Sequence, residues 1–237
     1  MTAALSISPF AAQLLQGPVR AGTAIGSGYM RFAEQVLALT RPGGHRMPNG
    51  IESDLVLTAD EPVTIGDGHL RTTTAAVTAG PLWDPRPQPR VRLSLSPRLT
   101  ISVDILAGRG PGLTPLGDDI LVGYLAGSAL AGGDPALLGA RAEQAARCTT
   151  ALSQTLLRLA ARGQLPEAAH LLLEHGDPEP LLRFGATSGK GIAAGLALAT
   201  HACTRAGHSQ TIRLTLPLQP AAPQFVLAIQ REDDPCW

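Results

Sequence analysis

One glycine-rich stretch, Gly108–Gly127, limits most strongly what this chain can fold into. It opens with glycines at alternate positions (108, 110 and 112), which leave the backbone bare of side chains. Thr114 and Pro115 then predict the start of a helix, because threonine is a good N-cap and proline is tolerated at the first helical position. An apolar run, residues 99–106, precedes the glycines and predicts a strand. The stretch therefore predicts a bare loop that leads from a strand into a helix.

The helix that follows contains small residues four positions apart: Gly123, Gly127 and Ala131. Residues with this spacing lie on one face of a helix. We therefore expect a smooth ridge against which another helix or strand approaches closely.

Two adjacent carboxylates, Asp118 and Asp119, fall in the first turns of this helix. The helix dipole favours negative charge there, so both residues can simply stabilise a helix that follows a tight turn. However, bare N–H groups at a helix start attract anions, whereas two carboxylates repel them. A site with both features favours either a phosphate-like ligand bridged by Mg²⁺ or a ligand with its own donors, such as an amide. The pattern is not a Walker loop, because no Gly-Lys-Ser/Thr follows.

The composition argues against several classes of partner. The 237 residues include 19 basic and 19 acidic side chains, without a basic patch interleaved with aromatics, so we expect no nucleic-acid partner. No run approaches the ~18 apolar residues of a membrane span, so we expect no membrane partner. Cys148, Cys203 and Cys236 show neither a disulfide framework nor metal-ligand spacing. We therefore expect a cytoplasmic protein.

The pattern of apolar and turn residues changes along the chain. Residues 19–98 contain short strand-like runs separated by turn residues, and Asp67-Gly68 marks the clearest hairpin. Residues 117–207 have helical periodicity, and two strand-like runs close the chain. The sequence thus predicts an α+β fold, with a small antiparallel β domain (sheet or barrel) over residues 1–98. A mostly α-helical domain with a C-terminal β hairpin is expected over residues 99–237.

Helices are expected at 117–131, 135–162, 165–175 and 189–206. The second of these carries hydroxyl and amide groups at Thr149, Thr150, Ser153 and Gln154, where the helix could break. The hydroxyls could bond back to carbonyls of their own helix, or they could form a polar wall that faces the glycine-rich loop.

A second glycine-rich entry into a helix spans residues 184–195. Thr187 or Ser188 can cap this helix, and Lys190, the one lysine of the chain, lies in its first turn. A lysine there is unfavourable for the helix dipole. It could therefore face a ligand, or it could simply be solvated.

Several motifs together resemble a known family. Residues 110–123 read Gly-Pro-Gly-Leu-Thr-Pro-Leu-Gly-Asp-Asp-Ile-Leu-Val-Gly and form the most specific of them. Ser27, Met47–Ile51, Leu82–Pro85 and Gly185–Gly189 follow the same family in matching order. Along most of its length the chain resembles a bacterial family that includes the AllH-type subunit of oxamate carbamoyltransferase.

The resemblance implies a subunit of a multi-subunit enzyme in nitrogen (purine or ureide) catabolism. Such an enzyme exchanges a carbamoyl group between oxalurate or oxamate and phosphate or carbamoyl phosphate. On this view the chain binds a small anionic substrate, and the candidate catalytic residues are Asp118, Asp119 and Lys190. The two aspartates would orient a donor or bind a metal ion, with Mg²⁺ as the candidate cofactor. The candidate ligand-binding residues are Gly110, Gly112, Thr114, Thr150, Thr187, Ser188 and Gly189.

Two positions depart from the family pattern. Leu116 stands where the family usually has serine, and Ala186 stands where histidine is common. Both changes remove polar groups beside the expected site. The competing interpretation is therefore a non-catalytic scaffold or regulatory subunit, in which the glycines serve close packing and the two aspartates hold a partner or a buried arginine.

Overall fold

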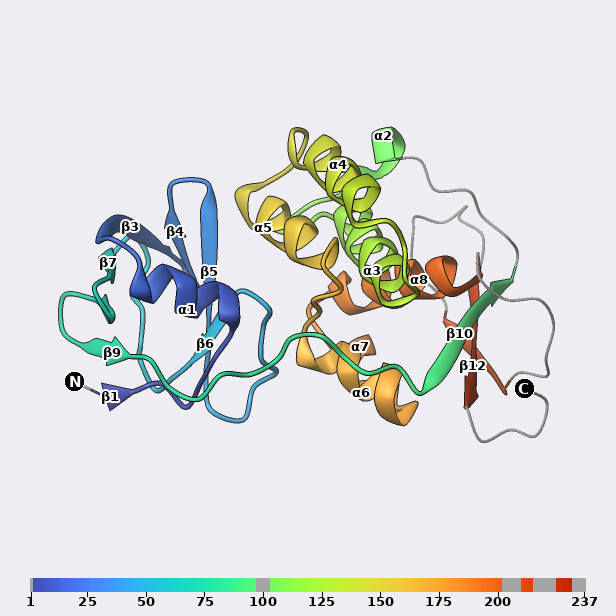
Figure 1. Ribbon diagram of the computed structural model, residues 1–237, viewed down its shortest axis with the longest axis horizontal. Coiled ribbons are helices and arrows are strands. Elements are labelled where there is room, and N and C mark those ends of the chain that lie inside the picture. The colour runs from blue at the N-terminus through green and yellow to red at the C-terminus, as the bar shows by residue number, and fades with distance from the viewer. Residues whose placement is uncertain (1, 97–102, 202–209, 215–224, 232–237) are drawn as a thin grey trace. The chain divides into compact units, whose positions relative to one another are not determined.

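The computed structural model describes residues 2–96, 103–201, 210–214 and 225–231 (Figure 1). The chain divides into two compact units, Met1–Pro85 and Arg86–Trp237. The first unit is built on a curled β sheet, and the second is mostly helical. The predicted α+β class is therefore confirmed, while a division into domains at residue 98 stays a prediction.

In the described part of the first unit, nine strands form one sheet in the order β1-β9-β8-β7-β3-β4-β5-β6-β2. The strands are β1 (Thr2–Ala3), β2 (Ser6–Ile7), β3 (Arg20–Ile25), β4 (Tyr29–Phe32), β5 (Gln35–Thr40), β6 (Gly50–Glu52), β7 (Pro62–Gly66), β8 (His69–Arg71) and β9 (Ala76–Thr78).

The sheet curls because two strands that are consecutive in the chain pair at its opposite edges. The N–H of Ala4 donates to the carbonyl of Thr78 in β9, and the N–H of Leu5 donates to the carbonyl of Glu52 in β6. Most neighbouring strands are antiparallel, as the sequence predicted, but β1 pairs with β9 and β5 with β6 in parallel. The result is a half-barrel.

A short helix, α1 (Pro9–Gln16), packs against this sheet. The Ser8 hydroxyl caps it by accepting from the N–H of Ala11, and proline occupies its first position. The expected hairpin is confirmed, since Asp67 and Gly68 join β7 to β8 with φ values of 48° and 79°. The core contains the fully buried side chains of Ile7, Leu15, Met30, Phe32, Leu37, Ile51, Ile65 and Leu70.

Seven helices and three strands make up the described part of the second unit. The helices are α2 (Val103–Leu106), α3 (Leu116–Leu130), α4 (Pro135–Ala146), α5 (Ala151–Ala160), α6 (Glu167–His175), α7 (Glu179–Leu182) and α8 (Ser188–His201). The strands β10 (Val91–Ser96), β12 (Phe225–Arg231) and β11 (Gln210–Leu214) form an antiparallel sheet in that order. The turn of the expected C-terminal hairpin, residues 215–224, lies outside the described residues.

The predicted strand at 99–106 is wrong where the structure describes it, because residues 103–106 form helix α2. Residues 99–102 lie outside the described residues. A short apolar run does not by its periodicity distinguish a strand from a buried helix. Here the run packs against α3 and α4, so helix packing decides its conformation.

Helices α3 and α8 pack closely against each other, and glycines on both make this possible. A β-carbon on Gly123 would collide with the carbonyl of Ile192, and one on Gly127 would lie 2.7 Å from the β-carbon of Ala199. The predicted ridge is thus confirmed at both glycines. It does not extend to Ala131, which is exposed at the end of α3. Within the described ranges, no helix combines the length and the apolar character needed to cross a membrane.

Candidate functional site

The glycine-rich loop, residues 107–115, joins α2 to α3. Gly108, Gly110 and Gly112 all have positive φ (71°, 123° and 94°). Positive φ values favour glycine. At two of the three positions close contacts also exclude a side chain. A β-carbon on Gly108 would collide with the carbonyl of Cys148, and one on Gly110 would lie 2.8 Å from the nitrogen of Leu116. Gly112 has open space around it, so only its backbone conformation favours glycine there.

Helix α3 begins without a side-chain cap. Pro115 is its N-cap residue, so the expectation that Thr114 caps the helix is wrong. The Thr114 hydroxyl instead shares a 2.9 Å hydrogen bond with the Ser188 hydroxyl at the start of α8. The Thr114 hydroxyl therefore bonds to a residue far away in the chain and not to its own helix. This hydrogen bond joins the two glycine-rich helix starts.

Asp118 is buried and has hydrogen-bond donors on both carboxylate oxygens. Its Oδ1 accepts from the N–H of Gly108 at 2.7 Å, and its Oδ2 accepts from the Thr149 hydroxyl. These bonds tie the first turn of α3 to the beginning of the loop and to the segment before α5. Asp118 thus fixes the shape of the loop.

Asp119 has a different environment, although it is the next residue. Its side chain is 2% exposed, and its Oδ2 has no hydrogen-bond partner among the described residues. A β-carbon on Gly191 of α8 would lie 2.7 Å from the Asp119 β-carbon, so α8 covers this carboxyl closely. Burial raises the pKa of Asp119 to about 8, and the charge of Asp118 adds to this, while hydrogen bonding with Ser188 and Thr114 opposes it. Asp119 is therefore mostly a neutral acid at pH 7.

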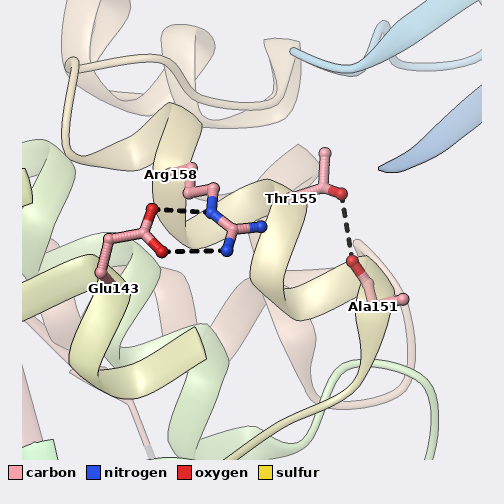
Figure 2. A network of polar contacts seen from close by, with 4 residues as sticks. All are labelled: Glu143, Ala151, Thr155 and Arg158. Atoms are coloured by element: carbon pink, nitrogen blue, oxygen red, sulfur yellow. Dashed lines mark hydrogen bonds and ion pairs between the residues drawn. The ribbon is translucent and has the colours of Figure 1, made fainter. Parts of the chain in front are cut away.

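The polar residues before α5 hold the loop from its other side. The Thr150 hydroxyl donates to the carbonyl of Leu113 at 2.6 Å and also caps α5 by accepting from the N–H of Ser153. The Gln154 amide donates to the carbonyl of Thr149 at 3.1 Å. For Thr149 and Thr150 a polar wall toward the loop is thus the correct interpretation, and the chain breaks between α4 and α5 where the sequence allowed it. Back-bonding within the helix is found at Thr155, which donates to Ala151 (Figure 2).

The second glycine-rich loop leads into α8 at Ser188. A β-carbon on Gly189 would collide with the carbonyl of Leu181, so this glycine is needed for the packing of α7 against α8. Thr187 is half-buried, and its carbonyl accepts from the N–H of Gly191. Lys190 is half-buried, and its side chain makes no hydrogen bond or ion pair with any residue that the structure describes.

The predicted site residues thus fall into three groups. Thr114, Ser188 and Asp119 form one cluster. Asp118 and Thr150 fix the loop, together with Thr149, which sequence reasoning placed in the polar run but not among the candidate site residues. The remaining predicted residues lie in the two loops or in the first turn of α8: Gly110, Gly112, Thr187, Gly189 and Lys190. Leu116 begins α3 half-buried, and Ala186 is exposed.

Binding of a magnesium ion by Asp118 and Asp119 stays a prediction. Both oxygens of Asp118 accept hydrogen bonds, from the N–H of Gly108 and the hydroxyl of Thr149, whereas Oδ2 of Asp119 has no hydrogen-bond partner among the described residues. Over the described ranges, no group of three or more His, Cys, Asp or Glu side chains could hold a metal ion.

Comparison with known proteins agrees with the resemblance seen in the sequence. The family model described as oxamate carbamoyltransferase subunit AllH matches residues 106–200. This segment contains α3, α5, both glycine-rich loops and all of α8 except its last residue. No curated protein and no solved structure matches the chain.

Proposed function

We propose that this chain is a subunit of a carbamoyltransferase-type enzyme that binds a small anionic ligand at the joined helix starts of α3 and α8. The observation that carries this proposal is the hydrogen bond between Thr114 and Ser188, because it brings two glycine-rich helix starts together within the segment that matches the family. Helix starts attract anions through their unpaired N–H groups and the helix dipole.

The backbone of the first loop supports anion binding. The N–H groups of Gly110, Gly112 and Leu113 donate to no residue in the described part of the chain, and all three residues are exposed. Thr150 and Asp118 hold this loop in place from two sides. The donors are therefore oriented before a ligand arrives, which reduces the entropy cost of binding.

The state of the two aspartates removes the electrostatic conflict that the sequence raised. The charge of Asp118 is compensated by two donors, and Asp119 is mostly neutral at pH 7. A small anion at the loop therefore does not need a bridging cation. Lys190, in the first turn of α8, supplies the positive charge nearest in sequence to Ser188.

The ligands that suit such a site are oxamate or oxalurate and carbamoyl phosphate, each of which carries a compact anionic group. Direct carbamoyl transfer between them needs no covalent nucleophile, because positioning and charge stabilisation lower its barrier. Other subunits of the enzyme would complete the site, and nitrogen or ureide catabolism in the bacterial cytoplasm is its expected setting.

A thermal-shift titration of the purified chain tests the proposal, with oxamate, carbamoyl phosphate and inorganic phosphate as ligands, each with and without Mg²⁺. A ligand at about 100 times its dissociation constant adds about 2.7 kcal/mol to the free energy of unfolding. We expect a shift with oxamate or carbamoyl phosphate that does not depend on Mg²⁺.

Two variants localise the effect. Lys190→Gln should reduce the shift, whereas Arg162→Gln, which removes one positive charge from an exposed position after α5, should leave it unchanged. If none of the three anions stabilises the chain, ligand binding by the isolated chain is refuted and a subunit that works only in complex with its partners is favoured.

A further inference from the structure

The sole asparagine of the chain, Asn49, directly precedes Gly50, the first residue of β6. Its side chain is fully buried, and its Nδ2 donates to the carbonyl of Val36 in β5 at 2.8 Å. Its own carbonyl accepts from the N–H of Ala38 at 2.9 Å. Asn49 therefore joins β6 to β5, two strands that run in parallel.

An asparagine that precedes glycine loses its side-chain amide readily, because the next residue has no side chain to hinder the reaction. The backbone nitrogen of Gly50 would give up its proton and form a bond to Cγ of Asn49. The bond between Cγ and Nδ2 would then break, and ammonia would leave with that proton. Water would open the resulting succinimide ring at either carbonyl, which gives aspartate or isoaspartate.

The native structure opposes the first step of this reaction. The N–H of Gly50 donates to the carbonyl of Met47 at 2.9 Å, so the attacking nitrogen is held in a hydrogen bond. Residues 47–50 are all buried, which keeps water away. A β-carbon on Gly50 would lie 3.0 Å from the carbonyl oxygen of Met47. The packing thus favours the same glycine that makes the peptide bond reactive, and the reaction requires this region to open.

Neither product fits the native structure. With an aspartate at position 49, a second carboxylate oxygen would replace Nδ2 and face the carbonyl of Val36, although Oδ1 already has no hydrogen-bond partner among the described residues. A buried charge without donors is costly. An isoaspartate would route the main chain through Cγ and lengthen it, which would shift β6 out of register with β5.

We infer that the peptide bond between Asn49 and Gly50 is a deamidation site that the fold of the first unit keeps unreactive, and that deamidation there prevents this unit from regaining its native fold. The inference does not depend on the proposed function, because the site lies outside the segment that matches the family model.

Mass spectrometry of the full chain tests the protection. The protein is incubated in mildly alkaline buffer with and without urea, and samples are digested with trypsin. The tryptic peptide of residues 47–71 contains Asn49 and no glutamine, so an increase in mass from amide to carboxyl identifies Asn49. We expect deamidation at least about a hundredfold slower in buffer than in urea, because the native region opens rarely. Rates that agree within a few fold would overturn the inference.

A core variant tests whether opening of the first unit controls the reaction. Ile65 in β7 is fully buried, and Ile65→Val should raise the rate in buffer about two- to tenfold while leaving the rate in urea unchanged. Val56→Ala is the matched control, because Val56 is exposed in the same unit and its loss should leave both rates unchanged. If Ile65→Val lowers the urea midpoint without raising the rate in buffer, the inference is wrong.

A refolding experiment tests the consequence and needs no variant. Wild-type chains are deamidated in urea and returned to buffer beside chains that spent only a short time in urea. Hydrogen exchange of β5 should be at least about tenfold faster in the deamidated chains, because β6 no longer pairs with it. Deamidated chains that regain the protection of unmodified chains would show that the products fit the fold after all.

Discussion

The α-carbon of Gly123 in α3 lies 2.9 Å from the position that a β-carbon on Gly195 of α8 would take. The same β-carbon would collide with the carbonyl of Ile120. The two helices therefore touch backbone to backbone, and this contact sets the distance between the loops that precede them.

We expect Gly195→Ala to lower the free energy of unfolding by about 1–3 kcal/mol, because the helices must separate to admit the methyl group. Urea denaturation measures the change. Gly139→Ala in α4 is the control, since a β-carbon there meets nothing within 4 Å. Removing a glycine from a helix interior should instead stabilise the protein by about 0.5–1 kcal/mol. Equal effects of the two variants would contradict the close packing of α3 against α8.

Thr149→Val should destabilise the protein by about 1–3 kcal/mol, because it leaves Oδ2 of the buried Asp118 without its donor. Thr149→Ser keeps the hydroxyl and should restore most of this loss. Both values come from chemical denaturation. A valine variant as stable as the serine variant would show that the hydroxyl does not hold Asp118.

The raised pKa of Asp119 makes stability depend on pH. Between its ordinary value of 3.8 and about 8, the folded state keeps a proton that the unfolded state has released. The free energy of unfolding therefore falls as the pH rises through this window, by at most about 1.4 kcal/mol per pH unit, and the effect is complete above about pH 8.

Asp119→Asn removes this dependence, so the variant should gain stability relative to the wild type as the pH rises. Denaturation of both proteins from about pH 5 to about pH 9 measures the difference. A difference that is constant over this range would show that the carboxyl titrates normally.

Glu143 in α4 and Arg158 in α5 form a bidentate ion pair (Figure 2). Nε of Arg158 donates to Oε1 of Glu143 at 2.7 Å, and Nη2 donates to Oε2 at 2.9 Å. Both side chains are well exposed (53% and 39%), so water and salt screen the pair. A double-mutant cycle with Glu143→Gln and Arg158→Gln should give a coupling of about 0.2–1 kcal/mol that decreases in high salt. A coupling well above this range, unchanged by salt, would refute a screened surface pair.

Much of the fold could be predicted because it depends on local signals. The Asp67-Gly68 hairpin, the break after α4 and the smooth face of α3 each follow from residues close together in the chain. The strand expected at 103–106 was wrong because packing against α3 and α4 overrides a short apolar pattern. The parallel pairings of β1 and β5 were also missed, since strand order depends on contacts between distant residues.

In the candidate site, too, some features follow from neighbouring residues and others from contacts between distant parts of the chain. The order of residues is enough to show that two glycine-rich loops each precede a helix, and that Asp118 and Asp119 fall in the first turn of one of these helices. The packing of the helices is needed to show that Thr114 bonds to Ser188, that Gly108 and Thr149 donate to Asp118, and that α8 covers the carboxyl of Asp119. This difference arises because backbone conformation and helix starts depend on neighbouring residues, whereas burial and hydrogen-bond partners depend on which helices pack together.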